Sequence, residues 1–268
     1  MAETPSVIES LVRATLAHHQ AGRLEQAVAG YERILAGDSE NGRMLANLAI
    51  ALNQLRRHID AERVCRRAIC VEPGNAEAWN RLGIILSDRR DFAASVEAYR
   101  RCVDLDPRHY LAWTNLGIAL VRLGVVHEAI HAFWRALDVE PGHTQALMHL
   151  IHQKQQACDW SELDPLVGRL VDQMRRDQAE INPFSFLFFC RDPGEMRLCA
   201  DRFAGRVVEQ VRAMPAVRRP LREPTGNRRL RIGYLSGDLH QHATSVLARE
   251  LFAAHDRGRF QIFGYSYG

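Results

Sequence analysis

The chain has 268 residues, of which 47% are hydrophobic and 25% are charged, and its formal net charge at pH 7 is +3. This length suggests one or two domains, and the apolar fraction is enough for a sizeable core. Because 35 basic residues are nearly matched by 32 acidic ones, the chain has no strong overall electrostatic field, and its net charge argues neither for nor against an anionic partner.

The N-terminal segment carries Glu3 and Glu9 and has no apolar stretch after a basic region, so it predicts no secretory signal. No window approaches the run of about 18 apolar residues that a membrane helix needs. We therefore expect a cytoplasmic protein without a membrane partner. The cysteines show no C-x-x-C spacing and are expected to be reduced, the first three of them buried at small apolar positions of helices. They are Cys65, Cys70, Cys102, Cys158, Cys190 and Cys199.

A period of 34 residues organises the first half of the chain. Pro73, Pro107 and Pro141 recur at this step, and so do Trp79 and Trp113. Other sets in the same register are Leu48, Leu82, Leu116 and Leu150; Gly83 and Gly117; Ala98 and Ala132; and Tyr31, Cys65, Tyr99 and Phe133. A fixed period of this length predicts helix–turn–helix units that bury their apolar faces by stacking on one another.

Small residues within each unit mark where its two helices cross. They are Ala49, Gly83 and Gly117 on the first helix, and Ala27, Ala61, Ser95 and Ala129 on the second. The recurring prolines then end the second helix, because a proline ring clashes with α geometry in the preceding residue and offers no amide donor.

The motif W-x-x-L-G at residues 79–83 and 113–117 resembles the tetratricopeptide repeat family. Two central units span about 76–109 and 110–143, and a unit at 42–75 has Leu45 in place of tryptophan. A weaker unit at 8–41 has Ala14 and Thr15 where leucine and glycine would stand, as terminal repeats often do. The resemblance implies an α-solenoid, and we assign residues 1–143 to about four repeats.

Residues 144–214 predict a degenerate repeat and transitional helices. The period continues for one helix, with Leu147 and Leu150 in register, and then breaks at residues 153–159. Further helices are expected over 160–174, beginning at Ser161, over 184–190 as a short buried helix, and from Asp192-Pro193 to about Met214.

The last part of the chain differs in character. Residues 215–229 have the proline, glycine and arginine content of a linker. Beyond them, 230–235 and 260–265 predict strands and 245–254 a helix, the outline of a β-α-β unit. Two strands and one helix cannot cover both faces and the edges of a sheet. We therefore expect residues 230–268 to form an incomplete Rossmann-like lobe. The expected fold class is therefore mostly α, a solenoid followed by transitional helices and a partial α/β lobe.

Three segments resemble the start of the catalytic region of SPINDLY-like protein O-GlcNAc transferases. They are C-D-W at 158–160, R-I-G-Y-L-S-G-D-L-H-Q-H at 231–242 and F-Q-I-F-G-Y-S at 260–266. The resemblance implies transfer of N-acetylglucosamine from UDP-GlcNAc to serine or threonine of proteins, with the repeats presenting the acceptor. It also implies that a second lobe further along builds most of the donor pocket. We therefore expect a fragment truncated within the catalytic region, inactive alone, and assign it no cofactor.

His242 is the candidate catalytic residue. The family pattern S-x-D-F-x-x-H falls on Ser236, Asp238, Leu239 and His242, so the resemblance implies that His242 is the active-site histidine. A loop after the carboxyl end of a strand is also where open α/β sheets bind ligands, and an imidazole can accept or position a hydroxyl proton. The alternative is a surface-loop histidine beside His240.

Asn47 and Asn115 are the candidate peptide-binding residues, at equivalent positions on the first helices of their repeats. The resemblance implies an asparagine ladder here that holds the main chain of an acceptor peptide on the concave surface, since an amide pairs with peptide groups. Arg13 and Arg81 interrupt this ladder. The alternative is that all four are ordinary solvated positions.

Other features predict no further ligand. The arginines at 218–231 have no interleaved aromatic residue, so a solvated linker is favoured over a nucleic-acid site. The histidines lack compact spacing with acidic or thiol partners, so no metal is expected. Two hypotheses of function remain: the front part of a SPINDLY-like O-GlcNAc transferase, and a non-enzymatic repeat scaffold for protein–protein interaction.

Overall fold

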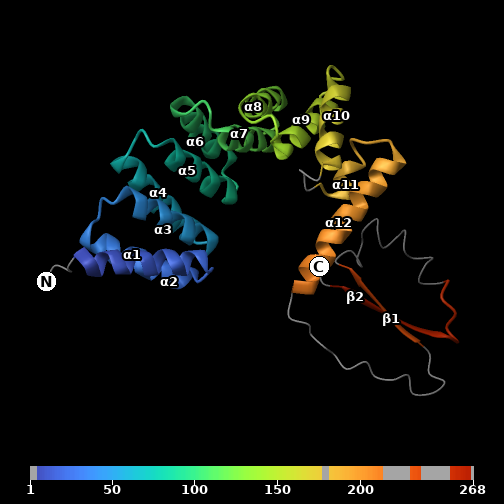
Figure 1. Ribbon diagram of the computed structural model, residues 1–268, viewed down its shortest axis with the longest axis horizontal. Coiled ribbons are helices and arrows are strands. Elements are labelled where there is room, and N and C mark those ends of the chain that lie inside the picture. The colour runs from blue at the N-terminus through green and yellow to red at the C-terminus, as the bar shows by residue number, and fades with distance from the viewer. Residues whose placement is uncertain (1–4, 177–180, 214–229, 237–253, 267–268) are drawn as a thin grey trace. The chain divides into compact units, whose positions relative to one another are not determined.

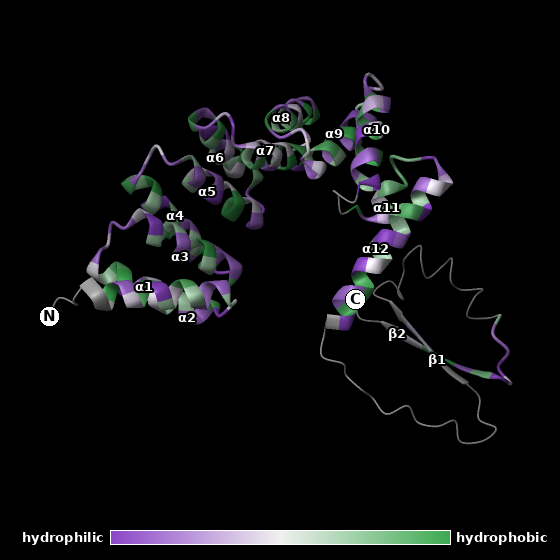
Figure 2. Cartoon of the chain, viewed as in Figure 1, coloured by the Kyte–Doolittle hydropathy of each residue, from purple (hydrophilic) through white to green (hydrophobic). Residues whose placement is uncertain are grey.

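The computed structural model describes residues 5–176, 181–213, 230–236 and 254–266, and it divides into two compact units, Met1–Val211 and Arg212–Gly268 (Figure 1). The predicted mostly α fold is confirmed. Figure 2 shows hydrophobic and hydrophilic residues alternating along the repeat helices, as amphipathic packing requires.

Ten helices of the first unit form five antiparallel hairpins within the described residues, each contacting the next along the chain. The hairpins are α1 (Pro5–Gln20) with α2 (Leu24–Gly37), α3 (Gly42–Gln54) with α4 (His58–Val71), α5 (Ala76–Asp88) with α6 (Phe92–Leu105), α7 (Tyr110–Arg122) with α8 (Val126–Val139), and α9 (Thr144–Gln156) with α10 (Leu163–Arg175).

The predicted crossing points hold because residue sizes complement each other. A Cβ atom at Gly83 would lie 2.5 Å from Cε1 of Tyr99, and one at Gly117 would lie 2.5 Å from Cε1 of Phe133. Where the second helix instead carries the smaller Cys65, the first helix carries Ala49. In these three hairpins, glycine thus stands on the first helix where the second helix carries a ring, and alanine where it does not.

In the first hairpin the small residue at the close crossing lies on the second helix and the larger one on the first. Thr15 stands where the next three hairpins have alanine or glycine, and its side chain occupies the space beside Gly30 of α2. A Cβ atom at Gly30 would lie 2.3 Å from Oγ1 of Thr15. The first unit therefore keeps a close helix crossing with the glycine on its second helix instead of its first.

The two repeat tryptophans are half-buried and fix the turns between hairpins. Trp79 Nε1 donates to the carbonyl oxygen of Pro73 at 3.1 Å, and Trp113 Nε1 donates to that of Pro107 at 2.9 Å. Both rings pack against the buried core. The recurrence of proline and tryptophan six residues apart therefore reflects one hydrogen bond that closes each turn.

An arginine repeats in register with these turns, at positions 33, 67, 101, 135 and 169. Arg101 and Arg135 lie over the rings of Trp79 and Trp113. In two repeats where leucine replaces tryptophan, the arginine reaches the turn itself: Arg67 donates to the Ser39 carbonyl at 2.9 Å and Arg169 to the Pro141 carbonyl at 3.0 Å. These arginines therefore replace the indole as the donor that closes the turn.

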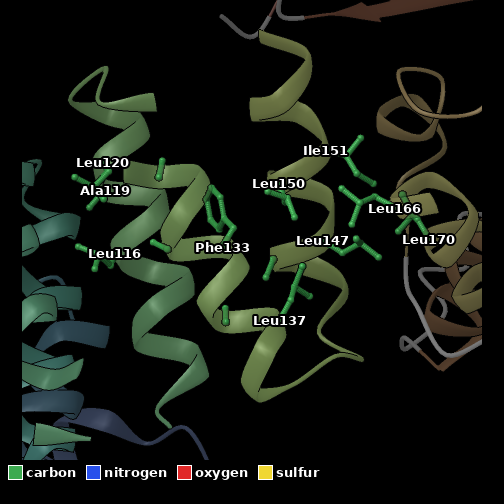
Figure 3. Packing of buried hydrophobic residues seen from close by; sticks show 14 of the residues in the cluster. Leu116, Ala119, Leu120, Phe133, Leu137, Leu147, Leu150, Ile151, Leu166 and Leu170 are labelled. Carbon is green, nitrogen blue, oxygen red and sulfur yellow. The ribbon is translucent and has the colours of Figure 1, made fainter. Parts of the chain in front are cut away.

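The period does not end where the sequence suggested. In α10, Leu163, Leu166 and Leu170 are buried 34 residues after the small core residues of α8, and Figure 3 shows Leu166 and Leu170 near Leu147 and Ile151 of α9. The apparent break is a longer turn, and the fifth hairpin stays in register.

This longer turn is built on a buried lysine. Lys154 is 3% exposed and donates to Asp159 Oδ2 at 2.5 Å and to Ser161 Oγ at 3.1 Å. The helix begins at Leu163, two residues after the predicted Ser161, since Asp159 accepts the Ser161 amide and holds Ser161 in the turn.

Two helices follow, α11 (Pro183–Phe186) and α12 (Pro193–Ala213). The predicted start at Asp192-Pro193 is confirmed, because Asp192 Oδ1 accepts the amides of Gly194 and Glu195. The prediction of a buried helix over 184–190 is wrong in part. Phe186 and Cys190 are buried, whereas the hydrophobic side chains of Phe184, Leu187 and Phe188 are exposed because the helix is only one turn long.

The second unit contains β1 (Leu230–Ser236) and β2 (Phe260–Ser266) among its described residues, paired in parallel from Leu230 opposite Phe260 to Ser236 opposite Ser266. Both predicted strands are confirmed. The predicted helix over 245–254 lies almost wholly outside the described residues.

Cysteine burial follows the predictions only in part. Cys65 and Cys102 are buried free thiols, and burial raises the pKa of each to about 12. Cys70 is exposed, contrary to prediction, because it is not among the residues that form the buried side of α4, which include Cys65, Ala68 and Ile69. No helix in the described ranges is long and apolar enough to cross a membrane.

Candidate functional site

The first helices of successive hairpins line one face of the solenoid. Helix α3 contacts α5, α5 contacts α7, and α7 contacts α9, so side chains from several repeats meet on this surface. Asn47, Arg81 and Asn115 lie on it at steps of 34 residues, on α3, α5 and α7. We call it the first-helix face.

Asn47 and Arg81 line the same pocket between α3 and α5, with a volume of about 290 Å³. Arg43, Glu72 and Glu77 contribute further charged side chains to its wall. The structure therefore places the asparagine and the arginine of the interrupted ladder at one site, where both can contact the same ligand.

Glu77 is the centre of a hydrogen-bond network beside this pocket. It accepts from His109 Nε2 at 3.0 Å and from Arg81 Nε at 2.8 Å. The hydrogen bond from His109, together with that from Arg81, lowers the pKa of Glu77 to about 2 despite its partial burial. Glu77 is therefore ionised at neutral pH and already paired.

His109 links two hairpins through both ring nitrogens. Its Nδ1 accepts the Ala112 amide at 3.1 Å and so caps α7, while Nε2 carries the proton donated to Glu77. The hydrogen bond with Glu77 raises the pKa of His109. Asn41 and Asn75 cap α3 and α5 at the equivalent positions through their side-chain oxygens.

Asn115 is partly held by its neighbours. Its Nδ2 donates to Asn80 Oδ1 at 3.4 Å, and the buried Asn80 in turn donates to Glu77 Oε2 at 3.4 Å. The amide oxygen of Asn115 makes no hydrogen bond with another described residue. Asn115 thus lies in the network of Glu77, one repeat away from the pocket of Asn47.

Sequence reasoning missed Glu77 and His109 as parts of this face, and it treated Arg81 only as an interruption. A periodic signal could not find Glu77, because the residues 34 positions away are Arg43 and Leu111, whereas His109 does recur, as His143. The chemistry of the face comes from positions that differ between repeats.

His242 lies outside the described residues, so its position stays a prediction. Near the described strands, Tyr234 Oη and His255 Nε2 are 2.9 Å apart, and the His255 ring packs edge-on against Phe260. No group of three or more His, Cys, Asp or Glu side chains suited to a metal is found among the described residues.

Two family models match the chain. The tetratricopeptide repeat model matches residues 16–78, 60–109 and 80–138, and the glycosyl transferase family 41 model matches residues 157–268. The chain therefore contains tetratricopeptide repeats followed by a segment similar to the family 41 glycosyltransferases. The second match begins within the fifth hairpin, at the turn that contains the C-D-W motif.

Two curated relatives are similar to this chain. One is the UDP-N-acetylglucosamine–peptide N-acetylglucosaminyltransferase of Caenorhabditis elegans, 28% identical over 122 residues that make up 42% of this chain and 11% of the relative. The other is the probable UDP-N-acetylglucosamine–peptide N-acetylglucosaminyltransferase SEC of Arabidopsis thaliana, 25% identical over 44% of this chain and 13% of the relative. The chain thus matches only about an eighth or less of each relative's length.

Solved structures with a similar fold are repeat proteins. MamA from Desulfovibrio magneticus aligns with a TM-score of 0.59 at 17% identity, over 64% of this chain and 97% of MamA. YrrB, described as a TPR protein with an unusual peptide-binding site, aligns with a TM-score of 0.52 at 18% identity, over 64% of this chain and 93% of YrrB. PilF of Pseudomonas aeruginosa aligns with a TM-score of 0.59 at 16% identity, over 77% of this chain and 91% of PilF. At these identities the likeness concerns the fold.

Proposed function

We propose that this chain serves a SPINDLY-like protein O-GlcNAc transferase, which moves N-acetylglucosamine from UDP-GlcNAc to serine or threonine of proteins in the cytoplasm. One observation carries the proposal: an array of tetratricopeptide repeats continues in register into the family 41 segment, through the turn at 157–162. In this proposal residues 1–143 and the fifth hairpin are the acceptor-binding part, 215–229 a linker and 230–268 part of the catalytic region.

The acceptor peptide binds in extended form along the first-helix face. Asn47 and Asn115 donate and accept hydrogen bonds with its main chain, which makes recognition independent of most side chains. Support comes from the pocket beside Asn47 and from the free amide oxygen of Asn115 among the described contacts. Truncating either amide to alanine is expected to weaken peptide binding several-fold.

His242 is the proposed catalytic residue, positioning or accepting the proton of the acceptor hydroxyl. The donor pocket of the resembled family lies mostly in a second lobe, so we expect residues 1–268 alone to bind peptides without turning over UDP-GlcNAc. The residues contribute no metal or other cofactor in this proposal.

Binding and transfer of labelled N-acetylglucosamine test the proposal separately. The purified chain is titrated with fluorescent extended peptides and then incubated with peptide and UDP-GlcNAc. Saturable peptide binding that falls in the Asn47→Ala and Asn115→Ala variants is expected, and unchanged binding in both variants would refute the peptide site. Any transfer by this chain should vanish in His242→Ala and persist in His240→Ala, the matched control.

A non-enzymatic scaffold is the second candidate. It is favoured by the small size of the sheet in the described part of the second unit, which consists of two paired strands. Transfer of N-acetylglucosamine by this chain that is lost in His242→Ala would exclude the scaffold, because a scaffold only binds partner peptides.

A further inference from the structure

The interruption of the asparagine ladder at Arg81 has an electrostatic consequence. Arg81 Nε is held by Glu77 at 2.8 Å, yet its Nη1 is buried and has no hydrogen-bond partner among the described residues. Leaving such a donor unsatisfied is costly, more so for a charged group. The fixed guanidinium thus presents an unused donor at the pocket between α3 and α5.

A second guanidinium lines the same pocket. Arg43 lies in the first turn of α3, four residues before Asn47 and so on the same side of the helix. Its side chain forms no ion pair with any residue in the described part of the chain. Two arginine side chains therefore border the pocket, one of them unpaired and the other only partly used.

The two carboxylates in the pocket wall do not accept hydrogen bonds from these unused arginine donors. Glu77 is engaged by Arg81 Nε and His109, and Glu72 Oε2 accepts from Asn75 Nδ2 at 2.8 Å. Because these acids leave Arg81 Nη1 and the Arg43 head without acceptors, the pocket can accommodate one more negative group. A doubly charged phosphate fits less well than a carboxylate, since it would also face both glutamates at close range.

We propose that the α3–α5 pocket binds a carboxylate of the bound peptide between Arg43 and Arg81. This inference rests on the proposed peptide-binding function and adds a side-chain preference to it: an acidic residue, or a free chain terminus, at this point of the peptide. Asn47 holds the adjacent main chain. A guanidinium pairs with a carboxylate more strongly than with a neutral carbonyl, so the arginine turns a sequence-independent ladder into a selective one.

The test uses peptides that differ only in charge. An acetylated and amidated 12-residue peptide of Ser, Thr, Ala and Val carries a single Glu scanned through every position, with the Gln set as the neutral match, and a third set has Gln and a free carboxyl terminus. We expect the best Glu peptide to bind about five-fold tighter than its Gln match, since a partly exposed ion pair is worth about 1 kcal/mol, and added salt should reduce the difference.

Three variants assign the effect to the pocket. Arg81→Asn restores the ladder residue found at 47 and 115, so it should retain binding of the Gln peptide and lose the preference for Glu, as should Arg43→Gln. Arg66→Gln, on the second helix α4, removes an arginine away from the pocket and should change neither. Thermal melts of all variants control for folding.

Each outcome is decisive. A preference restricted to the free-terminus set, lost in Arg81→Asn, would support a carboxylate site that takes chain ends. Equal binding of all three peptide sets would overturn the carboxylate site while leaving peptide binding intact. Failure of every peptide to bind would overturn the proposed function and this inference together, and a Glu preference that survives in both pocket variants would overturn the assignment to Arg43 and Arg81.

Discussion

The close helix crossing at Gly83 gives a quantitative test of how the repeats are packed. Replacing Gly83 with alanine would place a Cβ atom 2.5, 2.6 and 2.8 Å from three ring carbons of Tyr99, where ordinary contact begins at 3.4 Å. The ring cannot move away easily, because Tyr99 is only 2% exposed. Overpacking of this kind costs about 1–3 kcal/mol, against a gain of about 1 kcal/mol from helix propensity, so we expect Gly83→Ala to leave the protein less stable by up to about 2 kcal/mol.

The chain itself supplies the rescue. Ala49 and Cys65 occupy the positions of Gly83 and Tyr99 one repeat earlier. Tyr99→Cys alone should cost about 3 kcal/mol, because it leaves a cavity opposite glycine. In the double variant Gly83→Ala, Tyr99→Cys, the new methyl group partly fills that cavity, so the combined loss should be smaller than the two single losses added together by about 1–2 kcal/mol.

Urea denaturation of the four proteins measures this coupling, and Gly168→Ala provides the control. Gly168 is also inside a helix, but a Cβ atom there would meet nothing within 4 Å, so this change should stabilise the protein by about 0.5–1 kcal/mol. If Gly83→Ala stabilised as much as Gly168→Ala, or if the double variant were strictly additive, size complementarity would not explain the glycine.

Three further predictions concern polar contacts at helix ends, in turns and between hairpins. His109→Asn keeps a cap like those of the preceding repeats but loses the bond to Glu77, so it should cost about 0.5–1 kcal/mol in denaturation, less than His109→Ala, which also loses the cap. His143 is the N-cap residue of α9, but its side chain makes no capping hydrogen bond, so His143→Asn should add one and raise the melting temperature. An unchanged or lower melting temperature would show that the ring contacts of His143 stabilise the protein at least as much as an asparagine cap would. The pKa values of Glu77 and Asp159 are both lowered to about 2, mainly by the hydrogen bonds from His109 and Lys154. Their contributions to stability are therefore present above about pH 4.5 and are lost as the pH falls toward 2. Asp159→Asn should lose less stability between these pH values than the parent protein does, and an equal loss would contradict the pairing of Asp159 with Lys154.

Sequence periodicity predicted the solenoid because repeated packing demands repeated residues. The prolines, the small residues at the crossings and the large residues that face them all recur at 34 positions, and each has a contact in the structure that explains it. The same argument explains the misjudged end of the array. In α10 the small core residues are replaced by Leu163, Leu166 and Leu170, so the pattern of sizes changes although the register does not.

Other features could not be predicted because their signal is not apolar. The arginines at 67, 101, 135 and 169 recur as regularly as the prolines, but a charged residue on a helix surface normally indicates only solvent exposure. Only the structure shows that they stack on tryptophan or donate to the turn carbonyl. The exposure of Phe184 and Phe188 was unpredictable for a related reason, since a one-turn helix has no second turn to define a buried side.

The candidate site shows where reading a repeat sequence reaches its limit. Residues that every unit shares maintain the stack, and their recurrence makes them visible. Selective recognition, in contrast, requires neighbouring units to differ, because identical units would bind every stretch of a peptide alike. Arg81 between Asn47 and Asn115, and Glu77 facing His109, are such differences. In this chain the departures from the repeat pattern on the first-helix face are therefore the positions where peptide selectivity should be sought by mutation.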